Sequence, residues 1–368
     1  MIDTPVTAVT AAAYTIPTDT AEADGTLAWQ STTLVLVQVS AGRQVGTGWT
    51  YAPAAAAAVV AGILADLVTG ADPVDVPGLH ENMVRAIRNA GRPGIAGCAL
   101  SAVDLALWDL KARLWGVPLH RLLGAPAAVE VPVYGSGGFT TYRRRQLEAQ
   151  LSGWVQEQSI PRVKIKIGQG WGTRTDRDLD RIRQARRIIG EDTELYVDAN
   201  GAYGRKQAVR LAAESAEENV VWFEEPVSSD DLDGLSRIRQ VVRPDVTAGE
   251  YGYDLAYFER MCTAGAVDCL QADITRCGGI TDWLKVAAVA AAHNLEISGH
   301  CAPHAHAHAA ATIPNLRHLE WFHDHVRIEQ RFFDGAFDPT GGSVRPDPHA
   351  PGHGLTLRAP DIAPFQVA

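Results

Sequence analysis

The sequence contains few cysteines, and their spacing does not indicate a disulfide framework. Cys98, Cys262, Cys269, Cys277 and Cys301 are odd in number and include no C-x-x-C pair. A small secreted domain held together by disulfides would show a denser and even set. The pattern is typical of reduced thiols in an intracellular protein.

Positive charge is also scarce, and so are long apolar runs. The 33 lysines and arginines are outnumbered by 43 aspartates and glutamates, which gives a formal net charge of −10. A general nucleic-acid binder would usually present a basic face. Residues 1–13 lack the basic segment of a signal peptide, and the most apolar stretch, residues 52–65, is too short to cross a bilayer. The sequence therefore predicts a cytoplasmic protein that binds neither nucleic acid nor membrane.

The 368 residues are enough for a barrel and a second domain. The first part of the chain predicts three strands followed by three long helices, which is typical of a separate α+β unit. Strands are expected at residues 12–17, 32–39 and 46–51, and helices at 54–67, 80–90 and 97–115. The polar residues 19–25 are expected to form a mobile loop between the first two strands.

From residue 129 onward, short strands alternate with helices. Strands are expected at residues 131–134, 162–167, 195–198, 220–224, 246–250, 269–273, 295–300 and 317–320. Eight strands separated by helices are what a parallel barrel requires. In the competing architecture, an open doubly wound sheet, polar residues would gather at one switch point. Here they end nearly every strand, so the barrel is the prediction.

Beyond Glu320, glycine and proline punctuate a loop-rich tail that is expected to pack back onto the first domain. We accordingly predict a capping domain over residues 1–125 and a barrel over residues 126–325. Residues 326–368 would form a C-terminal segment that returns to the capping domain.

Three acidic residues end predicted strands at equal spacing. Asp198, Glu224 and Glu250 are separated by 26 residues and 26 residues again, the length of one strand, one helix and their loops. On parallel strands they would converge at one end of the barrel, where three carboxylates repel one another unless a cation lies between them. Mg²⁺ suits such an all-oxygen site. The sequence therefore predicts a magnesium site formed by these residues.

Basic and further acidic residues lie on other strands. Lys164 and Lys166 alternate along one predicted strand, so both face the barrel interior, where each ammonium group is expected to lower the pKa of the other. Without acidic residues on the neighbouring strands, two lysines at this spacing would more often lie on the solvent-exposed face of an edge strand. Asp273 and His300 end two later strands and would form an acid–base pair, although an isolated histidine is more often structural. Glu320 ends the last strand and would stabilise an oxyanion if its carboxyl were protonated.

The motifs occur in the order Lys164-Ile165-Lys166, Asp198-Ala199-Asn200, Glu224-Glu225-Pro226, Gly249-Glu250, Asp273, His300 and Glu320. In this order and spacing they resemble the enolase superfamily and, within it, the mandelate racemase (mandelate racemase/muconate lactonizing enzyme) subgroup, over essentially the whole chain. The resemblance implies a TIM-type (β/α)7β barrel with an N-terminal α+β capping domain completed by the C-terminal tail. It also implies magnesium-dependent abstraction of the proton α to a carboxylate through an enediolate.

The resemblance further implies a role for each catalytic candidate. Lys166 would abstract the proton, with Lys164 tuning it. The His300–Asp273 dyad would act from the opposite face of the substrate, and Glu320 would stabilise the enediolate. The three predicted metal carboxylates would bind Mg²⁺, which in turn would bind the substrate carboxylate.

Four further residues are candidates for contacts around this site. Asn200 and Glu225 are expected to support the metal ligands. Arg276 stands where several relatives carry lysine and is a candidate to contact the substrate or Asp273, and His304 is expected to border the substrate pocket. His304, His306 and His308 with His300 would suit zinc, but only His304 and His308 share a helical face, so zinc is not predicted.

Several reactions follow from one enediolate. We favour dehydration of a sugar acid, an aldonate or aldarate, to a 2-keto-3-deoxy acid. A racemase or epimerase and a cycloisomerase of a carboxylate remain open, as does a catalytically silent ligand-binding barrel. Substrate specificity is expected in residues 19–28. Relatives imply a closed symmetric homo-oligomer, and a small carboxylate is the expected ligand.

Overall fold

The computed structural model describes residues 4–368. It begins with an antiparallel sheet of three strands in the order β1 (Val6–Ala23), β2 (Ala28–Ala41) and β3 (Gln44–Tyr51). The helices that follow are α1 (Ala55–Val59), η1 (Val60–Leu64), α2 (Ala65–Val68), α3 (Val76–Ala86), η2 (Ile87–Asn89), α4 (Ile95–Trp115) and α5 (Leu119–Leu122). This α+β arrangement agrees with the prediction.

Helix α4 packs directly against β3 because two glycines leave room for it. A Cβ atom at Gly46 would lie 2.2 Å from the carbonyl oxygen of Ala106, and one at Gly48 would lie 2.2 Å from that of Ala102. Neither distance is possible for a real side chain. The buried apolar face of α4 therefore reaches the sheet backbone and closes the core of the cap.

The prediction of a mobile loop at residues 19–25 is wrong for most of that segment. Strand β1 continues to Ala23, with a register shift between Pro17 and Glu22, and its partner β2 begins at Ala28. The turn is confined to the residues between the two strands, where Asp24 N donates to Leu27 O at 3.0 Å. The hairpin resumes after this shift, where Glu22 and Ala23 pair with Trp29 and Ala28, so the polar residues form an irregular part of a long strand and not its end.

The second and larger part is a closed parallel barrel, as predicted. Its eight strands are β4 (Val131–Gly137), β5 (Arg162–Lys166), β6 (Glu194–Asp198), β7 (Val220–Glu224), β8 (Asp245–Ala248), β9 (Cys269–Ala272), β10 (Glu296–Gly299) and β11 (Leu316–Phe322). Neighbours in the chain are neighbours in the sheet, and β11 pairs with β4 to close the ring. All carboxyl ends of the strands therefore face one side of the barrel.

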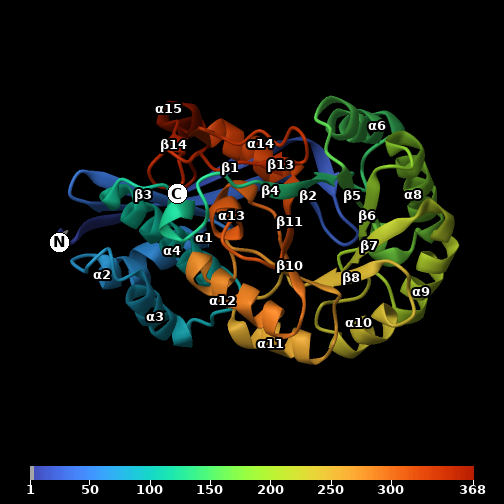
Figure 1. Cartoon of the computed structure of the whole chain (residues 1–368), viewed down its shortest axis with the longest axis horizontal. Helices are drawn as coiled ribbons and strands as arrows, with labels where there is room; N and C mark the ends of the chain where they lie inside the picture. The colour runs from blue at the N-terminus through green and yellow to red at the C-terminus, as the bar shows by residue number, and fades with distance from the viewer. Residues whose placement is uncertain (1–3) are drawn as a thin grey trace.

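Helices cover the outside of the barrel, and in Figure 1 α6, α8, α9 and α10 lie on the right, away from the cap helices α2 and α3. They are α6 (Arg144–Ser152), η3 (Gly153–Glu157), α7 (Gln169–Gly172), α8 (Thr175–Ile189), α9 (Arg205–Glu214), η4 (Ala216–Glu218), α10 (Leu232–Arg239), α11 (Leu255–Thr263), α12 (Gly279–Ala292) and α13 (Pro303–Ala310). Asp231 and Asp254 cap α10 and α11 by accepting backbone N–H groups. The apolar faces of these helices and strands form one core around the barrel.

The last part of the chain returns to the cap. It contains α14 (His323–Phe332), β12 (Phe333–Asp334), β13 (Ser343–Val344), β14 (Thr356–Leu357), α15 (Ala359–Ile362) and η5 (Ala363–Phe365). Trp49 Nε1 donates to Glu329 Oε1 at 3.0 Å, and Val367 N donates to Ala13 O at 2.8 Å. In Figure 1 the C-terminus accordingly lies beside the cap strands. The exact division at residues 125 and 325 stays a prediction. Among residues 4–368, no helix combines the length and hydropathy that a membrane crossing requires.

Candidate active site

Three carboxylates meet at the carboxyl end of the barrel. Asp198 and Glu224 are the last residues of β6 and β7, and Glu250 lies two residues beyond β8. Each offers an oxygen atom within 4.8 Å of the others, and all three side chains are buried. Equal spacing on adjacent parallel strands thus brings together residues that are far apart in the chain.

Two lysines face these carboxylates from β5. Lys164 Nζ lies 2.6 Å from Glu224 Oε2 and 2.8 Å from Glu320 Oε1. Lys166 Nζ pairs with Asp198 Oδ2. Both lysines point inward because alternate residues of a strand face the same side. Both are buried and therefore do not form a solvated strand face.

Lys164 does lower the pKa of Lys166, as expected, but neither lysine has a pKa below its ordinary value. Burial lowers the pKa of Lys164, but the surrounding carboxylates, Glu224 foremost, leave it well above its ordinary value. Burial is the largest influence on Lys166 and lowers its pKa, as does repulsion by Lys164, but Asp198, Glu320 and Glu224 together leave the pKa above its ordinary value. The carboxylates near the two lysines therefore raise the lysine pKa values by more than the neighbouring ammonium group lowers them.

The carboxylate cluster fits a hard divalent cation. The donor set consists of carboxylate oxygens, which Mg²⁺ prefers. Among residues 4–368, two buried oxygens around the cluster have no hydrogen-bond donor, Glu225 Oε1 and Asn200 Oδ1, and Glu250 Oε2 has only a long contact with His300 Nε2 at 3.3 Å. Buried acceptors without a donor are costly, and a hydrated cation would satisfy them. The residues present thus suit a magnesium site.

An aspartate–histidine pair lies at the ends of β9 and β10. His300 Nδ1 is 2.8 Å from Asp273 Oδ2, and Thr275 donates to the other oxygen, Asp273 Oδ1, from both its backbone N and its Oγ1 at 2.7 Å. Burial raises the pKa of Asp273, but the His300 hydrogen bond and Arg276 hold it well below its usual range. Asp273 is therefore anionic, and it fixes Nδ1 of His300 as the donor, so that Nε2 faces the site.

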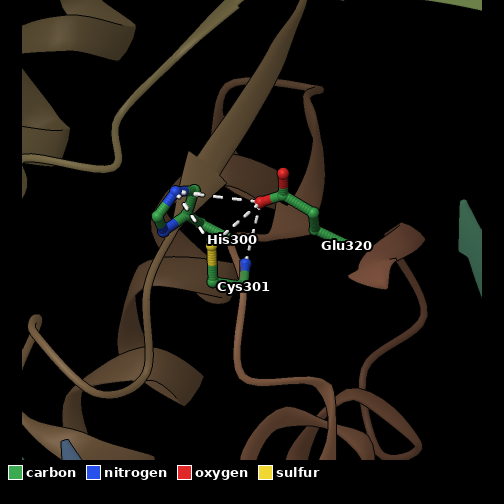
Figure 2. Close-up of side chains that lie close together, drawn as sticks. All are labelled: His300, Cys301 and Glu320. Carbon is green, nitrogen blue, oxygen red and sulfur yellow. Dashed lines mark hydrogen bonds and ion pairs between the residues drawn. The ribbon is translucent and has the colours of Figure 1, made fainter. Parts of the chain in front are cut away.

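Glu320 lies beside His300 and Cys301 (Figure 2), and its Oε1 atom pairs with Lys164. Ser136 Oγ donates to Glu320 Oε1 at 2.6 Å, and Cys301 N donates to Oε2 at 2.9 Å. Burial raises the pKa of Glu320, but Lys164 and His300 more than reverse this. The raised pKa that a proton-donating Glu320 needs is therefore absent while Lys164 is paired with Oε1.

Arg276 joins the carboxylate cluster to the dyad. Its Nη1 lies 3.3 Å from Glu250 Oε1, and its Nε lies 3.3 Å from Asp273 Oδ2. The sequence suggests that Arg276 contacts either the substrate or Asp273, and the structure contains the contact with Asp273. Asn200 N donates to Asp198 Oδ1 at 2.9 Å, and the side chain of Glu225 is buried beside Glu250. These three residues lie around the carboxylates, and their roles there stay predictions.

His304 does not border the site, and this expectation is corrected. Its Nδ1 bonds to Glu329, and its Nε2 accepts from Phe337 N at 2.9 Å. Both nitrogens are used for packing between α13 and the returning tail. His306 Nε2 accepts from Ile274 N at 3.0 Å and His308 Nε2 bonds to His353 O at 3.1 Å, so these two histidines are structural as well.

Sequence reasoning overlooked two residues that shape the site. Cys301 directly follows His300, and its Sγ lies 3.3 Å from His300 Nε2 (Figure 2). The position of Cys301 immediately after the predicted end of a strand is the feature of the sequence that could have identified it as a site residue. Ser136, on β4, carried no comparable signal because only closure of the barrel between β11 and β4 brings it to Glu320.

The tip of the β1–β2 hairpin covers this end of the barrel. A Cβ atom at Gly25 would lie 2.7 Å from Ile167 O and 2.8 Å from Ala199 O, the first residues after β5 and β6. Trp171 N donates to Gly25 O at 2.9 Å, and Thr140 N donates to Ala23 O at 2.8 Å. The cap thus contacts the loops around the lysines and Asp198.

Glu22, in this hairpin, makes stability depend on pH. Burial and the nearby Asp324 raise its pKa from 4.5 to about 8, although Trp29 Nε1 donates to it. Because the folded state holds the proton more tightly than the unfolded state, this residue lowers the free energy of unfolding as pH rises from about 4.5 to about 8. We expect Glu22→Gln to stabilise the protein by about 2–4 kcal/mol at pH 9 and by little at pH 4.

Urea unfolding at a series of pH values measures this effect. The exposed Glu148 gives a matched control, and Glu148→Gln should leave the pH profile of the wild type unchanged. An identical slope for Glu22→Gln and the wild type between pH 5 and 8 would contradict the assignment.

Two family models match the chain. One, the mandelate racemase/muconate lactonizing enzyme N-terminal domain, matches residues 3–124. The other, the enolase C-terminal domain-like model, matches residues 146–362. The chain is also 31% identical over 277 residues to an L-talarate/galactarate dehydratase of Salmonella typhimurium, a match that covers 74% of this chain and 68% of that protein. It is 31% identical to a 3,6-anhydro-alpha-L-galactonate cycloisomerase of Streptomyces coelicolor, over 94% of each.

Solved structures give the same result. A mandelate racemase/muconate lactonizing enzyme-like protein from Rubrobacter xylanophilus superposes with a TM-score of 0.95 at 47% identity, over 99% of this chain and 100% of that one. The Salmonella typhimurium L-talarate/galactarate dehydratase liganded with Mg and L-lyxarohydroxamate superposes with a TM-score of 0.90 at 26% identity, over 99% and 93%. The metal in that relative is the one for which the carboxylate cluster is suited.

Proposed function

Since the chain belongs to the mandelate racemase/muconate lactonizing enzyme family of the enolase superfamily, we propose that it dehydrates a sugar acid. The proton α to the carboxylate is removed, an enediolate forms, and loss of the β-hydroxyl leaves an enol that tautomerises to a 2-keto-3-deoxy acid. One observation carries the proposal. The His300–Asp273 dyad and the Lys164–Lys166 pair approach one carboxylate cluster from different strands of the barrel.

Each step needs a group that the chain supplies. Lys166 takes the α-proton as the neutral amine, a form that it can reach only after its ion pair with Asp198 is released. Lys164 holds Glu224 and Glu320 in place beside it. His300, as the imidazolium, gives its Nε2 proton to the departing hydroxyl, so that water leaves, while Asp273 stabilises the charged ring. Glu320 can offer a protonated carboxyl only after Lys164 has left its Oε1 atom. Asp198, Glu224 and Glu250 would hold Mg²⁺, which when bound neutralises the charge that gathers on the substrate carboxylate.

Relatives support the substrate class. Those matched include proteins named L-talarate/galactarate, arabinonate, L-rhamnonate and D-gluconate dehydratase. Cycloisomerisation is the second candidate, because a cycloisomerase is matched over 94% of both chains. The five cysteines are all free and buried, which suits a reducing cytoplasm. That location and a closed homo-oligomer remain predictions.

The decisive experiment incubates the protein with Mg²⁺ and a library of mono- and diacid sugars and their lactones in D₂O, followed by NMR. A 2-keto-3-deoxy product would establish dehydration and identify the substrate. Deuterium at the α-carbon without loss of water would mean racemisation or epimerisation instead. A ring-opened or ring-closed isomer would mean cycloisomerisation, and absence of exchange from every compound would count against the proposed function.

We also propose that the hairpin tip contributes to substrate binding. Gly25→Ala would force the tip away from Ile167 O and Ala199 O, so we expect KM for the preferred sugar acid to rise about tenfold, a change of about 1.4 kcal/mol, with kcat changing less. Gly62→Ala is the control, because a Cβ atom at Gly62 meets nothing within 4 Å. Equal KM values for the two variants would show that the hairpin tip does not contribute to substrate binding.

A further inference from the structure

Three different metal-binding groups meet beside the carboxylate cluster. His300 Nε2 lies 3.3 Å from Cys301 Sγ and 3.7 Å from Glu320 Oε2, and Cys301 Sγ lies 3.4 Å from Glu320 Oε2 (Figure 2). All three side chains are at least 96% buried, with exposures of 4%, 4% and 1%. The three atoms form a compact triangle from adjacent strand ends, and sulfur distinguishes it from the all-oxygen cluster.

The size of this triangle suits a tetrahedral zinc ion. Zinc bonds of about 2.0–2.3 Å to nitrogen, sulfur and oxygen place the ligand atoms about 3.4–3.6 Å apart, close to the separations found. We propose that His300 Nε2, Cys301 Sγ and Glu320 Oε2 form a site for one thiophilic divalent cation such as Zn²⁺, separate from the magnesium-type carboxylate cluster.

The surroundings already orient these ligands. Asp273 accepts from Nδ1 of His300 at 2.8 Å, the carboxylate–histidine contact that commonly supports a zinc ligand. Cys301 N donates to Glu320 Oε2 at 2.9 Å, which fixes that oxygen beside the thiol. Lys164 Nζ binds the other oxygen, Oε1, at 2.8 Å. Lys164 therefore leaves Glu320 Oε2 available to bind a cation.

The backbone and charges fit as well. Cys301 and Ala302 have φ values of 52° and 37°, a left-handed turn that is unfavourable for these residue types and that brings the thiol back toward Glu320. The bound thiolate and carboxylate would balance the two charges of the ion, with the thiol proton released to solvent.

A cation at this site would occupy the atoms that the reaction needs. It would bind Nε2 of His300 in place of the proton, so zinc should inhibit without displacing magnesium. This consequence for activity rests on the proposed function, whereas binding itself does not. The two can therefore fail separately.

Cobalt titration tests the binding. Co²⁺ is added to the protein in the presence of a large excess of Mg²⁺, and the charge-transfer absorption of a cobalt–thiolate bond is followed in the near ultraviolet. We expect this band to saturate at one Co²⁺ per chain, and Zn²⁺ to abolish it. Cys301→Ser should remove the band and weaken Zn²⁺ binding about 100-fold or more, since loss of even an outer partner commonly weakens binding 10–100-fold.

Cys262→Ser, at another buried free cysteine, is the control and should keep the band. Absence of the band in the wild type, or its persistence in Cys301→Ser, would overturn the proposal. In the activity assay, inhibition by Zn²⁺ should be unaffected by raising Mg²⁺ and should be relieved in Cys301→Ser. Inhibition that excess Mg²⁺ reverses would place zinc at the carboxylates instead and would overturn the separate site. If the cobalt band appears but no substrate is turned over, only the proposed function is in question.

Discussion

Lys166→Met is expected to lower kcat/KM by about 10²–10⁴-fold, the contribution that a positioned general base usually makes. The methionine keeps the length of the side chain but cannot accept the α-proton. Exchange of that proton with solvent deuterium should fall in parallel with turnover. Both are measured by NMR in D₂O on the same samples.

A second variant separates the two faces of the substrate. His300→Asn should lose dehydration while still exchanging the α-proton, because Lys166 remains intact. The exposed Lys206 provides the control, and Lys206→Met should behave like the wild type. If Lys166→Met kept α-proton exchange and His300→Asn lost it, the roles of the two residues would be reversed.

Removal of magnesium is expected to have the other large effect. Chelation should abolish turnover, and added Mg²⁺ should restore it. At 100 times its dissociation constant, a ligand that binds only the folded state stabilises a protein by about 2.7 kcal/mol, so the thermal midpoint should rise with Mg²⁺ even without substrate. This second measurement does not depend on knowing the sugar acid.

Glu250→Gln tests the assignment of the ligands. Of the three carboxylates, Glu250 is the one that forms no ion pair with a lysine among residues 4–368, and its charged partners are His300 and Arg276. The substitution should therefore disturb the lysines least, and it should raise the Mg²⁺ concentration for half-maximal stabilisation at least about tenfold. Glu259→Gln, on an exposed part of α11, should leave that concentration unchanged. An unchanged value for Glu250→Gln would exclude Glu250 as a ligand.

The sequence alone determined the barrel and the residues at its open end. Strand and helix periodicities are local properties, and the carboxyl ends of successive parallel strands lie on one side whatever the details of packing. The spacing of Asp198, Glu224 and Glu250 was therefore enough to predict that they converge. The positions of Lys164 and Lys166 followed from the alternation of side chains along one strand.

Only the tertiary structure determines the pKa values of the ionisable residues in the site and which further residues contact them. The raised pKa of Lys164 depends on Glu224 and Glu320, which lie 60 and 156 positions further along the chain, so no local pattern reports it. The same holds for Ser136 against Glu320, which meet because β11 pairs with β4.

The β1–β2 hairpin and His304 also show what the sequence alone does not predict. Residues 19–23 have a turn-like composition, but they continue strand β1, in which Glu22 and Ala23 pair with Trp29 and Ala28 of β2. His304 has the chemistry of a site residue, but its contacts with Glu329 and Phe337 of the returning tail use both nitrogens. Residue type and period are encoded within a few positions of the chain, whereas hydrogen-bond partners and pKa values depend on which distant segments meet.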